Sequence, residues 1–320
     1  MSVANRSPVL GSTELQIAAL FAVVAALYWP TTSSLWHRPV FGSNALLVVG
    51  LSLWLLARTR GRVAMAPVRG LPWMLLLLVP CSIASIVLWE SGIPALQLLL
   101  LPVLILLAAL TAFGSDVTRL IAVPVGFLYF AVPAWDLLAE PLQRLTLWVV
   151  SWAAPAIGVP ATISGTMVLL PGHMQFEVTP ACSGSGFLME GLAVAVLLGE
   201  LQHASVGRRL RLIASMTIIA LVTNWVRVLT LIQIGYTTQM RHVLVSQYHV
   251  MFGYILFVVV LAAFVTVATA RMPARPQSAA KVAGFPAAAR GAFLPALLGL
   301  AAAPVAAGLL ISAGFRLASI

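Results

Sequence analysis

Three residues in the second half of the chain have the side-chain types that acyl-transfer chemistry requires: Cys182, Arg227 and His249. A thiolate is a strong nucleophile, and it is favoured at a helix N-terminus and beside a cationic side chain. Histidine can take the proton of a thiol and pass one to a leaving amine. Arginine keeps its charge and offers fixed donors to a thiolate or an oxyanion. If the fold brings these residues together, they can carry out nucleophilic catalysis at a carbonyl group.

Each of the three residues belongs to a different apolar segment. Cys182 follows Pro180 and directly precedes one segment, and His249 opens another, with Gly253 one turn later. A glycine on an apolar helix lets a neighbouring helix approach closely. Arg227 belongs to a stripe at i, i+3 and i+4 spacing, which must face protein or water. The other members of the stripe are Thr223, Asn224, Thr230 and Gln233.

The composition defines the setting of these segments. The 320 residues are 61% hydrophobic and 8% charged, whereas soluble domains have about 25% charged residues. We therefore expect an all-α polytopic integral membrane protein with about eight or nine transmembrane helices, since each needs about 20 apolar residues. The nine apolar runs are residues 14–30, 43–57, 71–89, 93–113, 118–135, 184–201, 212–236, 249–270 and 293–315.

The basic residues predict the orientation of the helices. Arginine and lysine gather in segments 58–70, 202–211 and 271–292, and the positive-inside rule assigns such segments to the cytoplasm. With a cytoplasmic N-terminus, segments 136–183 and 237–248 then lie outside, together with Cys182. This pattern accounts for the net charge of +10, so we expect the lipid bilayer and no nucleic acid as a partner.

The long outer segment contains two predicted features. Residues 145–160 are apolar and Trp-rich, which favours a helix broken at Pro155 that spans the membrane, re-enters it or lies on its surface. Residues 161–181 are rich in β-branched residues and contain a Pro-Gly pair at 171 and 172. This pattern predicts a short extracytoplasmic β-hairpin that leads directly to Cys182.

Other interpretations of these residues remain open at this stage. Glu190 lies about 12 Å below Cys182 along a helix, which is near the depth of Arg227, so the two could form a buried ion pair. Glu190 and Arg227 could also line the polar path of a non-enzymatic membrane transporter or an envelope-polysaccharide assembly factor. Cys81 is interpreted as a core residue, and no disulfide is expected. We expect solvated loop positions for three other residues: His173, His203 and His242.

The elements PACSG at 180–184, NWVR at 224–227 and HVMFG at 249–253 resemble the exosortase/archaeosortase family. The resemblance covers roughly residues 137–270 and implies a membrane cysteine peptidase/transpeptidase. It implies that Cys182 is the nucleophile, Arg227 the anion-stabilising residue and His249 the acid/base. The implied supporting or substrate-binding residues are Asn224, Ser183, Gly184 and Glu190.

The same resemblance implies the partners and the location. The substrate would be an exported protein with a C-terminal PEP-CTERM-type sorting signal: a short motif such as Pro-Glu-Pro, a transmembrane helix and a basic cluster. The enzyme would lie in a bacterial cytoplasmic membrane with its active site outside. No cofactor is implied, and no metal-ligand spacing is present. Many members continue Cys-Ser-Gly with an apolar residue and Arg, whereas this chain has Ser185 and Gly186, so the subfamily and the exact sorting motif stay open.

The sequence divides into four expected parts. The first two are the N-terminal transmembrane helices and the catalytic core; a basic cytoplasmic linker and a last transmembrane helix follow. Their expected ranges are 1–136, 137–270, 271–292 and 293–320.

Overall fold

A computed structural model describes residues 42–67, 69–91 and 94–270 of the chain. The helices expected at 14–30 and 293–315 and the linker expected at 271–292 lie outside the described residues. The chain splits into two compact units, with the division between Ala134 and Trp135. This division falls two residues before the expected one.

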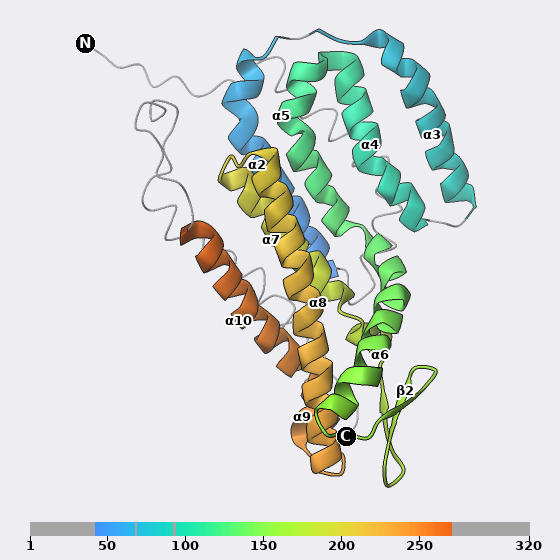
Figure 1. The fold of residues 1–320 in the computed structure, drawn as a ribbon. Helices are drawn as coiled ribbons and strands as arrows, with labels where there is room; N and C mark the ends of the chain where they lie inside the picture. The colour runs from blue at the N-terminus through green and yellow to red at the C-terminus, as the bar shows by residue number, and fades with distance from the viewer. Residues whose placement is uncertain (1–41, 68, 92–93, 271–320) are drawn as a thin grey trace, which may run out of the picture. The chain divides into compact units, whose positions relative to one another are not determined.

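The first unit is a set of antiparallel helices (Figure 1). Helix α3 packs against α4, α4 against α5 and α2 against α5. A core of Ile105, Phe113, Val117 and Ile121 lies between α4 and α5, as expected where apolar helices meet. The elements are α2 (Gly42–Met65), η1 (Pro72–Met74), α3 (Leu75–Glu90), α4 (Pro94–Phe113), α5 (Ser115–Gly126) and η2 (Phe127–Ala131).

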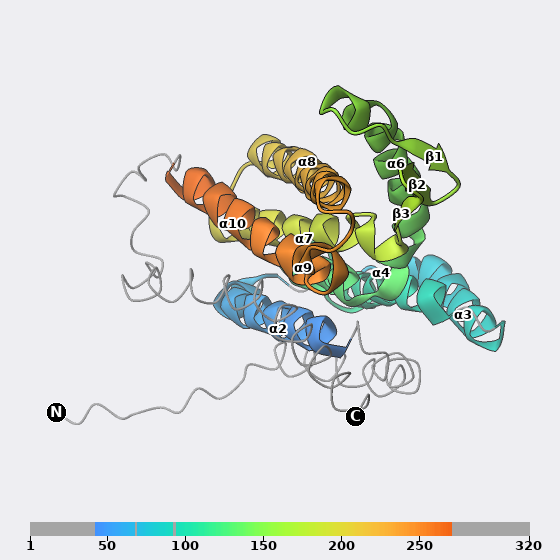
Figure 2. The same cartoon turned by 90° about the horizontal axis from the view of Figure 1, so that it is seen from below.

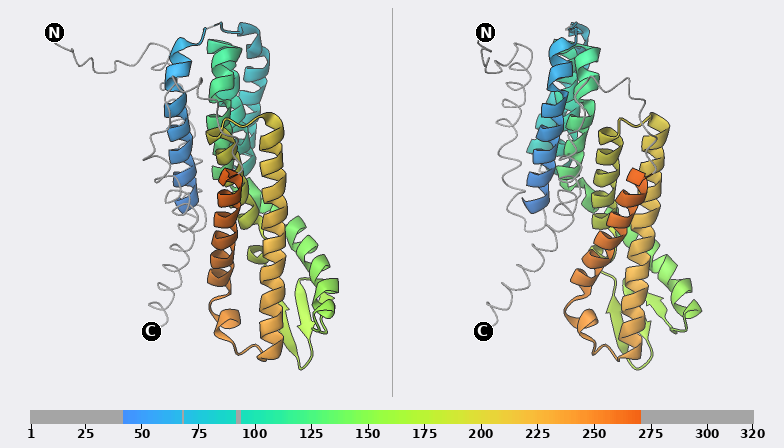
Figure 3. Two further views of the ribbon diagram at one scale, coloured as in Figure 1. Left: turned by 60° about the vertical axis from the view of Figure 1, so that its left-hand side comes forward. Right: turned by 90° about the vertical axis from the view of Figure 1, so that its left-hand side faces the viewer.

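The second unit contains all three candidate catalytic residues. Its long helices α7, α8 and α10 run side by side, with the short α9 at one end (Figure 3). Helix α8 packs against α6, α7 and α10. The elements are η3 (Pro133–Leu138, across the division), α6 (Ala139–Ala156), β1 (Thr162–Ser164), β2 (Met167–Leu170), β3 (Met174–Glu177), η4 (Pro180–Cys182), α7 (Ser185–Leu201), α8 (Val206–Thr237), α9 (Val243–Ser246) and α10 (His249–Ala270).

The predicted hairpin is present, but it is part of a larger sheet. Strands β1, β2 and β3 form an antiparallel meander in that order, with Ile163 opposite Val168 and Val168 opposite Phe176. The expected Pro171-Gly172 turn joins β2 to β3. A second turn at Gly165, whose φ is +61°, joins β1 to β2. We did not predict β1, because Gly165 was the only residue in the sequence that we could have read as this turn. The meander lies against α6 (Figure 2).

Helix α6 corrects the expectation for residues 145–160. It begins at Ala139, six residues earlier, and ends at Ala156, so Pro155 lies in its last turn and does not break it. One face is buried against the sheet and α8, whereas Trp148 and Trp152 on the other face are 63% and 56% exposed. Helix α6 is therefore amphipathic.

The ends of the long helices are tied together by polar contacts. Arg209 at the start of α8 forms an ion pair of 2.8 Å with Glu200 at the end of α7. Arg208 donates to the carbonyl of Ala268 in α10 at 3.1 Å, and Gln202 donates to the same carbonyl at 3.4 Å. The arginines of segment 202–211 therefore gather at one end of the unit, and the sheet and α9 lie at the other (Figures 1 and 3).

Three helices in the described part of the chain are long and apolar enough to cross a membrane: Ala95–Phe113, Val206–Thr237 and His249–Ala270. A fourth crossing results if the helical segments Ser115–Ala131 and Ala134–Ala156 together form one span. Each of the seven apolar runs expected between residues 43 and 270 falls on helical structure. The helical class is therefore confirmed, and the count of eight or nine spans stays a prediction.

Gly114, between α4 and α5, is expected to be indispensable for the first unit. Its φ of 84° and ψ of −176° lie in a region that essentially only glycine adopts, at a cost of about 1–3 kcal/mol for other residues. A Cβ atom there would also lie 2.0 Å from the carbonyl oxygen of Arg69. Gly114→Ala should therefore lower the melting temperature of the purified protein in detergent. Gly61→Ala, in α2 with open space around it, is the control and should keep or raise this temperature; equal melting temperatures would contradict the prediction.

Candidate active site

Cys182 ends the 3-10 turn η4, just before α7 begins. Its backbone N–H donates to the carbonyl of Thr179 at 2.8 Å, and the Thr179 hydroxyl donates to Sγ at 3.7 Å. The residue is only 4% exposed. We call residues 178–184 the cysteine loop. Its internal contacts set the direction in which the thiol points.

The end of the cysteine loop explains why Ser183 and Gly184 follow the cysteine. Gly184 is the N-cap of α7 and has a φ of +87°, which disfavours any residue with a Cβ atom. A Cβ atom there would also lie 2.8 Å from Cγ of Asn224. The buried Ser183 hydroxyl accepts the N–H of Ser185 at 3.2 Å. Both residues therefore shape the turn from η4 into α7.

Asn224 of α8 holds the cysteine loop from the side. Its Nδ2 donates to the carbonyl of Cys182 at 2.9 Å and also contacts the hydroxyl of Thr146 in α6 at 3.4 Å. Both Asn224 and Thr146 are 0% exposed. The side chain of Asn224 therefore lies between the nucleophile candidate and α6.

Arg227, one turn after Asn224, joins the segments that carry the other two candidates. One terminal nitrogen donates to the carbonyl of Ala181 at 3.5 Å, and the other donates to the carbonyl of His249 at 3.4 Å. Its Nε is buried without a hydrogen-bond partner. The guanidinium carbon lies 5.6 Å from the centroid of the Phe187 ring. A single buried cation thus links the cysteine loop, α7 and α10.

Gly253 of α10 leaves room for this cation. A Cβ atom at this position would lie 2.3 Å from Nε of Arg227 and 2.8 Å from its Cζ. We expected this glycine to let a neighbouring helix approach closely. The group that lies against it is the side chain of Arg227, not the backbone of a helix.

His249 is the first residue of α10 and is half-buried. Its carbonyl accepts the bond from Arg227, and its Nδ1 is buried without a hydrogen-bond partner. In this structure, the one hydrogen bond to Sγ of Cys182 from a described residue is that of Thr179. The fold therefore brings Cys182, Arg227 and His249 together through backbone carbonyls, whereas the thiol and the imidazole do not bond to each other.

A comparison with protein families bears on this arrangement. The family model described as transmembrane exosortase matches residues 36–266, which include all three residues. The chain belongs to the transmembrane exosortase family. Neither a curated protein nor a solved structure matches it. The resemblance found in the three short elements is thus confirmed over more than two thirds of this exosortase.

Glu190 of this exosortase does not pair with Arg227. It lies on α7, 9% exposed, and its Oε2 is buried without a hydrogen-bond partner. Two ion pairs between described residues of the second unit, Arg144–Glu140 and Arg209–Glu200, include neither Glu190 nor Arg227. The hypothesis of a buried Glu190–Arg227 ion pair is therefore wrong for this structure, because the terminal nitrogens of Arg227 donate to the carbonyls of Ala181 and His249 instead.

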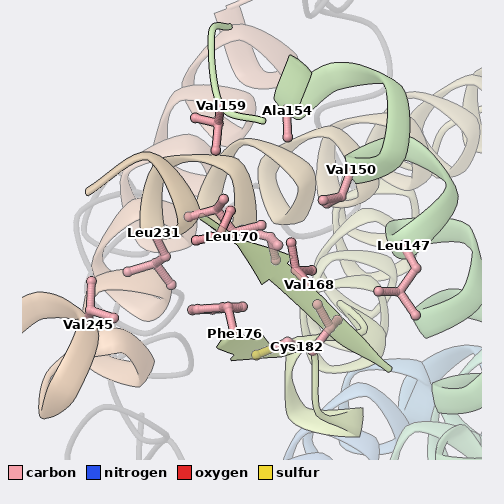
Figure 4. Packing of buried hydrophobic residues seen from close by; sticks show 13 residues of the cluster. Leu147, Val150, Ala154, Val159, Val168, Leu170, Phe176, Cys182, Leu231 and Val245 are labelled. Carbon is pink, nitrogen blue, oxygen red and sulfur yellow. The ribbon is translucent and has the colours of Figure 1, made fainter. Parts of the chain in front are cut away.

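The exosortase thiol lies among apolar side chains (Figure 4). Cys182 belongs to a buried cluster formed by the sheet, α6 and α8. Val168 and Phe176 come from the sheet, Leu147 from α6 and Leu231 from α8. Cys182 therefore packs among apolar side chains and also has polar contacts to Thr179 and Asn224.

The remaining candidate residues lie away from this site or have other contacts. Cys81 is a free, half-buried cysteine in the first unit. His173 and His203 are exposed, as expected. His242 is not simply solvated, because its Nδ1 accepts the N–H of Leu244 and caps α9. Within the described residues, no group of three or more His, Cys, Asp or Glu side chains could hold a metal ion.

Sequence reasoning missed the contribution of α6. Gln143 donates to the carbonyl of Val178, and Thr146 contacts Asn224. Both residues lie on the buried face of α6, together with Leu147 and Val150. The periodicity of these residues could have shown that this face is buried, but not that its two polar members reach the cysteine loop.

Gly253→Ala is expected to reduce substrate processing by about 10²-fold, because displacing a positioning group by about 1 Å can cost that much. The added methyl group would displace the guanidinium of Arg227. Processing is measured relative to membrane abundance, because displacing a buried cation also lowers stability. Gly186→Ala, in the first turn of α7 with open space around it, should process normally. Equal processing by the two variants would contradict the prediction.

Proposed function

We propose that this exosortase is a membrane cysteine peptidase/transpeptidase that cleaves C-terminal sorting signals of exported proteins. One observation carries the proposal: Arg227 bridges the carbonyls of Ala181 and His249. Through this bridge a buried cation lies beside the segment that bears the thiol and the residue that bears the imidazole. Nucleophilic catalysis at a carbonyl needs this combination of groups.

The proposed reaction has two steps. His249 takes the proton of the Cys182 thiol, and the thiolate attacks the scissile carbonyl to form a tetrahedral oxyanion, which Arg227 stabilises. The intermediate collapses to a thioester as the C–N bond breaks, and His249 gives a proton to the leaving amine. An acceptor nucleophile or water then attacks the thioester, and His249 takes its proton as Cys182 leaves. Catalytic hydrogen bonds often form only in the substrate complex, so the absence of a thiol–imidazole bond is compatible with these roles.

The alternative of a transporter or an envelope-polysaccharide assembly factor has less support. It relied on Glu190 and Arg227 as the lining of a polar path. Arg227 instead has two terminal nitrogens bound to backbone carbonyls and lies against Phe187 and Gly253. A cation fixed in this way suits a site with defined geometry better than a pathway for a moving solute.

The proposed substrate is the C-terminal sorting-signal helix of an exported protein, with a short motif such as Pro-Glu-Pro before it and a basic cluster after it. The proposed location is the cytoplasmic membrane of a bacterium, crossed several times by the chain. The end of the second unit with Arg208, Arg209 and Arg211 is then cytoplasmic by the positive-inside rule. The sheet and the cysteine loop lie at the opposite, extracytoplasmic end.

Cys182→Ala is expected to abolish processing of a co-expressed substrate with a C-terminal sorting signal, because no other group replaces a thiolate nucleophile. The measurement is the ratio of cleaved to full-length substrate on immunoblots, with membrane abundance measured in parallel. Cys81→Ala is the matched control and should process normally, because Cys81 is a half-buried cysteine of the other unit. Loss of processing in the Cys81 variant alone would show that the nucleophile is misassigned.

The orientation predicts which engineered cysteines react outside the cell membrane. Ser164→Cys in β1 and Ser205→Cys before α8 replace exposed residues at opposite ends of the second unit. Each is made in a chain without Cys81 and Cys182 and treated with a membrane-impermeant maleimide in spheroplasts. Position 164 should be labelled in intact spheroplasts, and position 205 only after permeabilisation. The reverse pattern would refute the orientation and the outward-facing site.

A further inference from the structure

The buried face of α6 contacts the cysteine loop directly at its first residue and, through Asn224, at its fifth. At one end, Nε2 of Gln143 donates to the carbonyl of Val178. At the other, Thr146 contacts Nδ2 of Asn224 at 3.4 Å, and the same Nδ2 donates to the carbonyl of Cys182 at 2.9 Å. Gln143 is 7% exposed, and Thr146 and Asn224 are 0% exposed. Side chains far away in sequence therefore hold the first and fifth residues of the loop.

The residues between these two anchors direct the thiol. The carbonyl of Thr179 accepts the N–H of Cys182, and its hydroxyl donates to Sγ. Thr179 directly follows the anchored Val178. The position of the Thr179 hydroxyl, and with it the direction of Sγ, thus depends on where the carbonyl of Val178 is held.

Packing alone does not account for a glutamine and a threonine at these positions. Leucine and valine side chains fill the neighbouring positions of the buried face of α6, and they would serve a purely apolar contact. A buried amide or hydroxyl costs free energy unless it is hydrogen-bonded. The partners of Gln143 and Thr146 are the cysteine loop and the asparagine that holds it, so the contact to this loop is what these polar groups supply.

We propose that Gln143 and Thr146 are positioning residues, which fix the cysteine loop so that Sγ of Cys182 faces the scissile carbonyl. This inference rests on the proposed function, in which Cys182 is the nucleophile. Both residues act through the loop backbone and Asn224 and do not touch the reacting atoms. Supports of this kind hold a reactive group within a fraction of an ångström of its productive position.

The test uses the full-length protein in nanodiscs and two measurements. Hydrogen exchange of the peptide that covers residues 178–184 reports the order of the loop without any substrate. Steady-state kinetics with a purified protein that ends in a Pro-Glu-Pro motif, an apolar helix and an arginine cluster report kcat and KM. The variants are Thr146→Val, which has nearly the same shape without the hydroxyl, Thr146→Ser, which keeps the hydroxyl, and Gln143→Met, which loses the donor.

We expect Thr146→Val and Gln143→Met to exchange about tenfold faster in the loop and to lose about tenfold in kcat, the size of one lost buried hydrogen bond. KM should not change, because neither residue contacts substrate. Thr146→Ser should restore both values. The matched control is Thr217→Val, since the Thr217 hydroxyl donates to the carbonyl of Ile213 in its own helix, away from the cysteine loop.

Two results would overturn the inference. Unchanged hydrogen exchange in the loop would show that α6 does not order the loop. Faster exchange in the loop with an unchanged kcat would show that the order of the loop does not affect the reaction. If the substitutions only destabilised α6, exchange would also become faster in residues 139–156. Thr146→Ser would then not restore slow exchange in the loop alone. If Cys182→Ala keeps activity, the proposed function fails, whereas the exchange data still report whether α6 orders the loop.

Discussion

The second unit depends on one buried cation, the guanidinium of Arg227. Removing a charge from water is costly unless the charge is hydrogen-bonded or paired, and here two main-chain carbonyls accept its protons. They belong to Ala181 and His249, which precede α7 and begin α10 respectively. Satisfying the cation therefore fixes these two segments relative to α8. The close approach of Gly253 and the ring of Phe187 complete its surroundings.

Three of the six buried side-chain polar atoms that lack a partner in the described part of the chain belong to this site. Nε of Arg227, Nδ1 of His249 and Oδ1 of Asn224 are all buried without a partner. Such atoms are rare in folded proteins, since each costs about 1–3 kcal/mol. The apolar cluster of the sheet, α6 and α8 supplies the compensating stability. The site is thus where the fold accepts a local cost, which is typical of functional regions.

The sequence predicted the positions of the helices better than the contacts between their side chains. Apolar runs located the helices, and the i, i+3, i+4 stripe predicted a face of α8 turned towards protein or water, on which Asn224 and Arg227 are buried. The rise along a helix predicted that Glu190 lies near the depth of Arg227, and this was wrong. Helices α7 and α8 pack so that Gly184 lies beside Asn224 and Gly191 beside Met216, which puts Glu190 well below Arg227 along α8. The contacts of Gln143 and Thr146 span 35 and 78 residues, and no local periodicity encodes them. They follow only from the packing of α6 beside the cysteine loop.

The geometry explains why position 227 holds arginine and not merely a positive charge. The planar fork presents several donors in fixed directions, so one side chain can bind carbonyls from two segments and still lie 5.6 Å from the centroid of the Phe187 ring. A lysine has a single ammonium nitrogen, which would donate either to the carbonyl of Ala181 or to that of His249. In the proposed function, the same fork that holds the segments together also supplies the positive charge for the thiolate. Structure and proposed chemistry are therefore inseparable at Arg227, whereas at Thr146 the support of the proposed nucleophile can be altered without removing that charge.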